Sequence, residues 1–178
     1  MATTAIAQPE PVGAVSHEAR AGKYLSFQLG TEEFAIQVLK VREIMGIQHI
    51  TAVPHMPSDV RGVINLRGRV VPVIDLRLKF GLEEMEYGQR TCIIVVQLQK
   101  DSTVQMGIIV DEVSEVLNLA AADIQNTPDF GSEAAPPYLL GMANVKGKVK
   151  ILLDIDEILT GSEFGGIREL LHSTPSVN

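Results

Sequence analysis

The chain repeats itself, and this repeat restricts the folds open to it more than any other feature of the sequence. Residues 61–76 (RGVINLRGRVVPVIDL) align with residues 140–155 (LGMANVKGKVKILLDI) at an offset of 79 positions. The matched pairs are Gly62 and Gly141, Asn65 and Asn144, Gly68 and Gly147, Val70 and Val149, and Asp75 and Asp154. Two valine-rich strands align by chance more easily than a shared Gly-x-x-Asn-x-x-Gly pattern with a common aspartate, so the sequence predicts an internal duplication.

A second alignment extends the repeat toward the start of each copy. Residues 34–44 (FAIQVLKVREI) align with residues 106–116 (MGIIVDEVSEV) at an offset of 72 positions. The matched pairs are Ile36 and Ile108, Val38 and Val110, Val41 and Val113, and Glu43 and Glu115. Each copy is then about 65 residues long and holds roughly five strands.

Short β-branched runs separated by turn residues predict a mainly all-β fold. The runs lie at residues 24–29, 34–38, 62–66, 70–76, 92–98, 105–110 and 148–155, with weak helical signals at 58–61 and 154–159. A five-stranded copy is too small for a sandwich, whereas closure into a barrel removes its exposed edges. We therefore expect two small barrels, at about 23–85 and 86–160, joined near 81–90 and sharing an apolar face. The sequence leaves open whether the barrels exchange strands.

Composition adds limits on the core, the termini and the compartment. Hydrophobic residues make up 46% of the chain but aromatic residues only 4%, so the core is expected to be aliphatic. Residues 1–22 are rich in alanine and proline and predict a disordered tail, and residues 161–178 predict a second tail with a short amphipathic stretch at 167–171. The start of the chain lacks the features of a signal peptide, and no apolar run approaches ~20 residues, so we expect a cytoplasmic protein.

The charge distribution disfavours general nucleic-acid binding but leaves one local exception. The formal net charge is −7, which repels a phosphate backbone. Residues 61–79 nevertheless contain five cations and a single acid; the cations are Arg61, Arg67, Arg69, Arg77 and Lys79. This strip is interpreted either as a partner-binding patch or as solvated charge along strand edges.

No constellation of catalytic, metal-binding or nucleotide-binding residues is recognisable. Cys92 begins an apolar run and is expected to be a small buried core residue, and the four histidines have no metal-ligand spacing. Phosphate-cradling and nucleophile-elbow motifs are absent from the sequence. Asp75 and Asp154 follow equivalent strands and are interpreted as caps of the next turn. The sequence therefore predicts a non-enzymatic protein without a cofactor or metal.

Two matching hairpin turns, Arg67-Gly68 and Lys146-Gly147, each place a cation before a glycine. Glycine supplies the positive φ that such turns require, and the cation projects outward. The charge serves either solubility or partner recognition.

The stretch Arg61-Gly-Val-Ile-Asn-Leu-Arg-Gly-Arg-Val-Val-Pro-Val-Ile-Asp-Leu76 resembles the CheW family of bacterial chemotaxis coupling proteins. Lys40-Val-Arg-Glu-Ile44, Ile109-Val-Asp-Glu-Val113 and Tyr138-Leu-Leu-Gly141 extend the resemblance, which covers about residues 23–160. It implies two SH3-like five-stranded barrels and an adaptor that couples methyl-accepting chemoreceptor tips to the regulatory domain of the histidine kinase CheA. Such an adaptor is expected to be a monomer in isolation and a member of a receptor array.

The resemblance also implies roles for individual residues. Arg67, Val41, Val113 and Val116 fall at positions that the family uses for the receptor, and Val38 and Glu43 lie toward CheA. Gly62, Asn65, Gly68, Gly141 and Gly147 are structural turn residues. The second copy reads Asn-Val-Lys-Gly, so no second receptor site is assumed there.

Three other functions compete with this interpretation. One is a CheW-like adaptor of a non-flagellar pathway such as twitching motility. Another is a small β-barrel that binds nucleic acid through residues 61–79, although such proteins stack bases on aromatic side chains and this strip has only Phe80 at its end. The last is an enzyme with Cys92 as nucleophile, which lacks a neighbouring activating base in the sequence.

Overall fold

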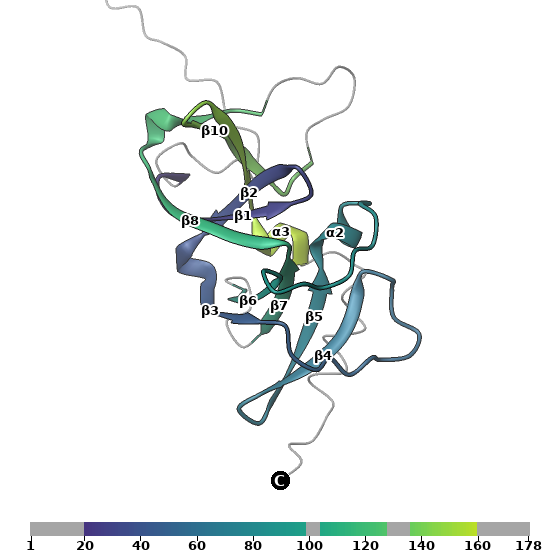
Figure 1. Ribbon diagram of the computed structural model, residues 1–178. Helices are drawn as coiled ribbons and strands as arrows, with labels where there is room; N and C mark the ends of the chain where they lie inside the picture. The colour runs from purple at the N-terminus through teal and green to yellow at the C-terminus, as the bar shows by residue number, and fades with distance from the viewer. Residues whose placement is uncertain (1–19, 99–103, 128–135, 160–178) are drawn as a thin grey trace, which may run out of the picture.

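The computed structural model describes residues 20–98, 104–127 and 136–159, and within these ranges the chain is built mainly of strands (Figure 1). The strands are β1 (Gly22–Leu29), β2 (Glu32–Gln37), β3 (Val41–Gly46), β4 (Val60–Leu66), β5 (Arg69–Asp75), β6 (Cys92–Gln97), β7 (Gln105–Val110), β8 (Glu112–Leu119), β9 (Ile124–Gln125), β10 (Leu139–Val145) and β11 (Lys148–Leu153). The helical segments are short: η1 (Val38–Lys40), α2 (Leu76–Lys79), η2 (Ala121–Asp123) and α3 (Ile155–Leu159).

The strands form two sheets, each wrapped around its own apolar interior. Barrel 1 has the strand order β3-β6-β7-β5-β4, and barrel 2 has the order β8-β1-β2-β11-β10-β9. In each sheet one pair is parallel, β5 with β7 and β11 with β2, and the other pairs are antiparallel. Figure 1 shows barrel 2 above barrel 1, with α2 and α3 between them.

The two barrels exchange their hairpins. The hairpin β1–β2 belongs to barrel 2 with the C-terminal strands, and the hairpin β6–β7 belongs to barrel 1. A boundary near residue 85 therefore does not separate the two sheets, and the question of strand exchange is answered. Alignment cannot predict this arrangement because the two hairpins are equivalent in the repeat and either one completes a barrel.

Strand register matches in the two barrels, as a duplication requires. Ile74 of β5 lies opposite Ile108 of β7, and the repeat-equivalent pair Leu153 and Ile36 occupies the same place in barrel 2. The turns that follow Asn65 and Asn144 also match, because Arg67 has a φ of 51° and Lys146 a φ of 54°. The predicted duplication is confirmed at these positions.

Gly62 and Gly141 are required for the same reason in the two barrels. Each has a positive φ, 138° and 151°, next to a register shift in its strand. A Cβ atom on Gly62 would lie 2.0 Å from the carbonyl oxygen of Thr51, and one on Gly141 would lie 2.6 Å from that of Gln125. The segment of Thr51, which bridges to Val63, lies too close to Gly62 for any side chain at that position. Strand β9, which pairs with β10, lies equally close to Gly141.

Among the residues that the structure describes, three apolar clusters form the core. One fills barrel 1 and includes Ile64, Val73 and Ile93; another fills barrel 2 and includes Tyr24, Leu140 and Leu152. The largest, here called the inter-barrel core, takes side chains from both sheets and from α2 and α3. A row of aromatic rings, Phe27, Phe34, Phe80 and Tyr138, crosses this seam with centroid separations of 6.1, 5.6 and 5.7 Å.

Some expectations about chain segments need correction. Gly22 begins β1, and buried Arg20 donates a hydrogen bond from Nη1 to the carbonyl oxygen of Leu140 at 2.6 Å, so the ordered part starts before residue 23. The helical signal at 154–159 is confirmed by α3, whereas residues 58–61 form a turn and the start of β4. Residues 1–19 and the predicted tail at 161–178 lie outside the described residues.

Candidate protein-binding site

Arg67 projects from the turn between β4 and β5 and is 78% exposed as a side chain. The side-chain oxygen of Asn65 accepts a hydrogen bond from the backbone N–H of Gly68 at 2.8 Å, which fixes the turn. Nη2 of Arg67 lies 3.0 Å from Oε1 of Glu43 on β3. The residue predicted for the receptor and a residue predicted for CheA are thus in direct contact.

Barrel 2 carries the equivalent ion pair. Nζ of Lys146, in the turn between β10 and β11, lies 4.0 Å from Oε2 of Glu115 on β8. Lys146 is the repeat equivalent of Arg67, and Glu115 is the repeat equivalent of Glu43. The sequence predicted both pairs of equivalent positions but did not predict that they contact each other.

The four valines predicted as partner contacts fall into two groups. Val38, Val41 and Val113 are partly buried and pack against the inter-barrel core. Val116 is 58% exposed on β8. Val41 therefore contributes to the inter-barrel core, whereas Val116 lies on the outer surface of barrel 2.

Sequence reasoning named Val116 but missed several other exposed aliphatic side chains. Leu39 in η1 is 89% exposed, and Ile44, Val70 and Val149 are 45%, 57% and 52% exposed. Ile44 is the repeat equivalent of Val116, and Val70 is that of Val149, but this equivalence does not by itself predict that the side chains are exposed. Exposure at both members of two equivalent pairs marks a shared surface property of the barrels.

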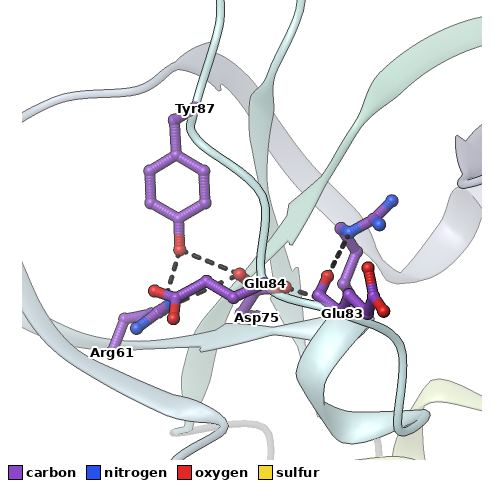
Figure 2. Close-up of polar contacts among 6 residues, drawn as sticks. Arg61, Asp75, Glu83, Glu84 and Tyr87 are labelled. Atoms are coloured by element: carbon purple, nitrogen blue, oxygen red, sulfur yellow. Dashed lines mark hydrogen bonds and ion pairs between the residues drawn. The ribbon is translucent and has the colours of Figure 1, made fainter.

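A polar cluster fastens the connector after α2 to barrel 1 (Figure 2). Buried Asp75 accepts hydrogen bonds from the hydroxyl of Tyr87 and from the backbone N–H of Arg77, both at 2.9 Å. Arg61 donates to the same tyrosine hydroxyl at 2.9 Å and to Glu84 at 2.5 Å. Burial and the bond to Asp75 raise the pKa of Tyr87 to about 12.

Both aspartates at the strand ends cap the turns that follow, as predicted. Oδ1 of Asp75 accepts from the N–H of Arg77 in α2, and Oδ1 of Asp154 accepts from the N–H of Asp156 at 3.1 Å in α3. Burial raises the pKa of Asp154. These carboxylates stabilise helix starts and do not form a pair.

The basic strip at residues 61–79 is largely neutralised by carboxylates. Its ion pairs are Arg61 with Glu84, Arg67 with Glu43, Arg77 with Asp111 and Lys79 with Asp59. The remaining cation, Arg69, is exposed. A strip paired in this way offers little net charge to a nucleic-acid backbone.

Comparison with known proteins identifies the family. A family model described as a CheW-like domain matches residues 23–163. The chain belongs to the CheW family. It is 40% identical over 141 residues to the chemotaxis protein CheW of Klebsiella aerogenes, with 79% of this chain and 83% of that protein covered. It is 36% identical over 151 residues to the chemotaxis protein CheW of Rhizobium meliloti, with coverages of 84% and 96%.

A solved CheW structure has the same fold. The crystal structure of the scaffolding protein TtCheW from Thermoanaerobacter tengcongensis matches with a TM-score of 0.70 and 27% identity, over 80% of this chain and 95% of that one. The predicted resemblance and the predicted fold of two SH3-like barrels are confirmed. Membership of the CheW family makes this chain a chemotaxis signal-transduction adaptor.

The chain of this CheW family member passes between the barrels twice, and an ion pair holds each crossing. Lys40, between β2 and β3, pairs with Asp156 of α3. Asp111, between β7 and β8, pairs with Arg77 of α2 at 2.6 Å and accepts from the N–H of Gly30 at 2.7 Å. These contacts add polar links to the apolar seam and fix how the two barrels meet.

Cys92 is less buried than predicted. It is the first residue of β6 and is partly exposed, and its thiol donates to the carbonyl oxygen of Arg90 at 3.2 Å. The apolar run that suggested a core position begins one residue later, with buried Ile93. Within the described ranges, no group of three or more His, Cys, Asp or Glu side chains is arranged to hold a metal ion, and no helix is long and apolar enough to cross a membrane.

Proposed function

We propose that this protein couples the cytoplasmic tips of methyl-accepting chemoreceptors to the regulatory domain of the histidine kinase CheA. It does so in the cytoplasm by protein–protein binding and catalyses no reaction itself. The observation that carries the proposal is the match of the CheW-like domain to residues 23–163, because it includes both barrels and the seam. The surface geometry supports the partner assignments.

The proposed receptor contacts are Arg67, Val41, Val113 and Val116. A receptor tip is a helical hairpin, and an aliphatic surface accepts the apolar ridge of such a helix. The exposed guanidinium of Arg67 is suited to a charge-assisted hydrogen bond with a helix carboxylate. The partly buried valines at positions 41 and 113 supply the edge of the inter-barrel core on which a ridge packs.

The proposed CheA contacts are Val38 and Glu43. Glu43 is bonded to Arg67, so the surfaces for the two partners adjoin at this ion pair. Adjoining surfaces would allow one partner to affect the other through a direct contact. Individual contacts of this size are weak, and multivalency within an array raises the overall affinity.

The test measures the two partners separately. Affinities for a soluble receptor hairpin and for the isolated CheA regulatory domain are determined for the wild-type chain and for Arg67→Glu. We expect wild type to bind both and the variant to lose receptor affinity by about tenfold or more, because an anion then faces the helix carboxylate. Its affinity for the CheA domain is expected to change by only about two- to threefold. Failure of wild type to bind either partner would contradict the proposal.

A further inference from the structure

An apolar groove lies at the seam between the barrels, and none of the proposed partner contacts lines it. Its volume is about 560 Å³. Barrel 2 contributes the turn between β1 and β2 and parts of β10 and β11, and the other wall is formed by the end of α2 and the residues that follow it. A concave, mainly apolar surface of this volume is typical of a binding site.

The side chains of the groove are incompletely covered. Its large apolar residues that are only partly buried are Phe34, Phe80, Tyr138, Leu139, Met142 and Ile151. Leu82 on the α2 side is 38% exposed. Phe34, Phe80 and Tyr138 are also three members of the aromatic row that crosses the seam. A continuous set of partly covered apolar side chains indicates an interaction surface, unlike single exposed residues.

The chain itself returns to this groove before the described residues end. Leu153, the last residue of β11, lines the groove, and α3 then ends at Leu159, which is buried in the inter-barrel core. Six residues separate Leu153 from Leu159 and span at most about 20 Å, even when extended. The next eight, up to Ile167, span up to about 26 Å. Ile167 can therefore reach the groove from the end of α3.

We propose that residues 167–171 of the same chain dock into this groove as a short helix. In a helix, Ile167, Leu170 and Leu171 share one face, because they follow the i, i+3, i+4 spacing. An isolated helix of this length is not stable in water, so it forms only on the groove. The connecting residues 160–166 include three glycines and keep the segment at a high effective concentration.

The charges of the groove and of the segment match this arrangement. Glu32, at the start of β2, lines the groove and is exposed. Arg168 lies about 100° around a helix from Ile167, so it borders the apolar face and can approach Glu32. Glu169 lies on the opposite side of the helix from the apolar face and stays in water. An attraction of this kind is weak at the surface, so the apolar contacts dominate.

Docking of residues 167–171 would brace the two barrels against each other. The groove takes side chains from both sides of the seam, so one helix laid in it contacts both at once. The brace does not depend on the proposed partners, because Arg67, Glu43 and the four valines proposed as partner contacts lie outside the groove.

Methyl NMR of the full wild-type chain tests the inference directly. We expect nuclear Overhauser contacts from the methyl groups of Leu170 and Leu171 to those of Met142 and Ile151, with intensities per molecule that do not change on dilution. Absence of these contacts at every concentration would overturn the inference. Contacts that appear only as the protein is concentrated would also overturn it, because the groove would then hold the segment of a second copy.

Variants outside the folded barrels give a matched comparison. Leu170→Gln/Leu171→Gln is expected to shift the methyl signals of Met142 and Ile151 and to abolish the contacts from Ile167. Val177→Gln changes another apolar residue after α3 and is expected to leave these signals as in wild type. Leu82→Gln alters the groove instead and is expected to weaken the contacts from Ile167. Groove signals that are identical in wild type and in the leucine variant would overturn the inference.

A partner titration separates this inference from the proposed function. A receptor hairpin or CheA regulatory domain is added to wild type and to Leu170→Gln/Leu171→Gln. We expect neither partner to shift the signals of Met142 and Ile151 in wild type. If a partner shifts them equally in both proteins, the groove belongs to that partner and the docked segment is ruled out, while the proposed function stands. If neither partner binds but the Leu170 and Leu171 contacts are present, the proposed function fails and the docked segment stands.

Discussion

Nη2 of Arg67 lies 3.0 Å from Oε1 of Glu43, and this contact joins a turn of barrel 1 to the strand that enters it from barrel 2. The pair is solvent-exposed on the arginine side, so its contribution to stability is small. Because the pair joins a proposed receptor contact to a proposed CheA contact, we expect it to take part in binding.

A charge swap tests whether the receptor binds the positive charge of Arg67 itself or only requires an intact ion pair between positions 67 and 43. We expect Arg67→Glu to change the free energy of unfolding by no more than about 0.5 kcal/mol and to weaken receptor binding. The double variant Arg67→Glu/Glu43→Arg restores opposite charges but leaves an anion in the turn. It is expected to remain weak toward the receptor hairpin in a binding titration. Full recovery in the double variant would show that only the pair geometry matters.

A buried ion pair inside barrel 2 gives a stability prediction. Lys150 is 4% exposed and pairs with Glu33, whereas the equivalent positions of barrel 1 hold Val71 and Gln105. Burial lowers the pKa of Lys150. We expect Glu33→Gln to cost roughly 3 kcal/mol because it leaves an ammonium group buried without its carboxylate.

The matched double variant removes both charges from barrel 2. Glu33→Gln/Lys150→Met fills the length of the lysine side chain with an apolar one and is expected to unfold within about 1.5 kcal/mol of wild type. Urea denaturation measures both variants. If the double variant is less stable than Glu33→Gln alone, the prediction is wrong. The ion pair would then stabilise barrel 2 by more than the cost of leaving one of its charges buried alone.

The polar cluster around Tyr87 predicts a pH dependence at alkaline pH. The pKa of Tyr87 is about 12 in the folded protein, against about 10 for an exposed tyrosine. Because the pKa of Tyr87 is higher in the folded than in the unfolded protein, its neutral hydroxyl stabilises the fold. This stabilisation is fully present below about pH 10 and is lost as the pH rises toward 12. Tyr87→Phe removes a hydrogen bond to buried Asp75 and is expected to cost about 1–2 kcal/mol near neutral pH.

Denaturant unfolding of wild type and Tyr87→Phe at several pH values checks this prediction. The difference between their free energies of unfolding is expected to be constant from pH 7 to about pH 9 and to shrink above about pH 10. A difference that stays constant up to pH 12 would mean that the hydroxyl does not link Asp75 to Arg61 in the folded state.

The equivalent glycines predict matched losses of stability. Gly62→Ala and Gly141→Ala each force a Cβ atom toward a backbone carbonyl at a positive φ, and we expect each to cost at least about 2 kcal/mol. Gly46→Ala is the control, because a Cβ atom at this position would meet no atom within 4 Å and its φ is not in the left-handed region. Thermal unfolding should leave this control within about 1 kcal/mol of wild type. Equal stability of all three variants would contradict the close backbone approach.

The repeat predicted much of the fold because its matched residues have local structural causes. Gly62 is required by a close backbone contact and Gly68 by a turn, and Asp75 caps a helix. The same residue type stands at each equivalent position, Gly141, Gly147 and Asp154, for the same reason. The strands β3 and β8 were not recognised as separate apolar runs, because their charged and exposed residues obscure the alternation. The hairpin exchange was not predictable. The β1–β2 and β6–β7 hairpins are equivalent in sequence, and which barrel each one joins depends on long-range pairing and not on local sequence pattern.

The candidate site was predictable in its residues but not in its contacts. The motif identified Arg67 and Glu43, and the family resemblance assigned them to different partners. Only the folded chain shows that they touch, since 24 positions separate them and the contact depends on closure of barrel 1. Leu39 and Val149 were missed because exposure of an aliphatic residue cannot be read from a β-branched run.

The coupling of a receptor to the kinase is the central claim, and a capture experiment tests it directly. Receptor hairpins are immobilised, and retention of the CheA regulatory domain is measured with and without this protein. We expect retention that depends on the added chain and falls by about tenfold or more with Arg67→Glu. If the chain binds the hairpins and the CheA domain separately but never retains the CheA domain on the hairpins, it is not a coupling adaptor.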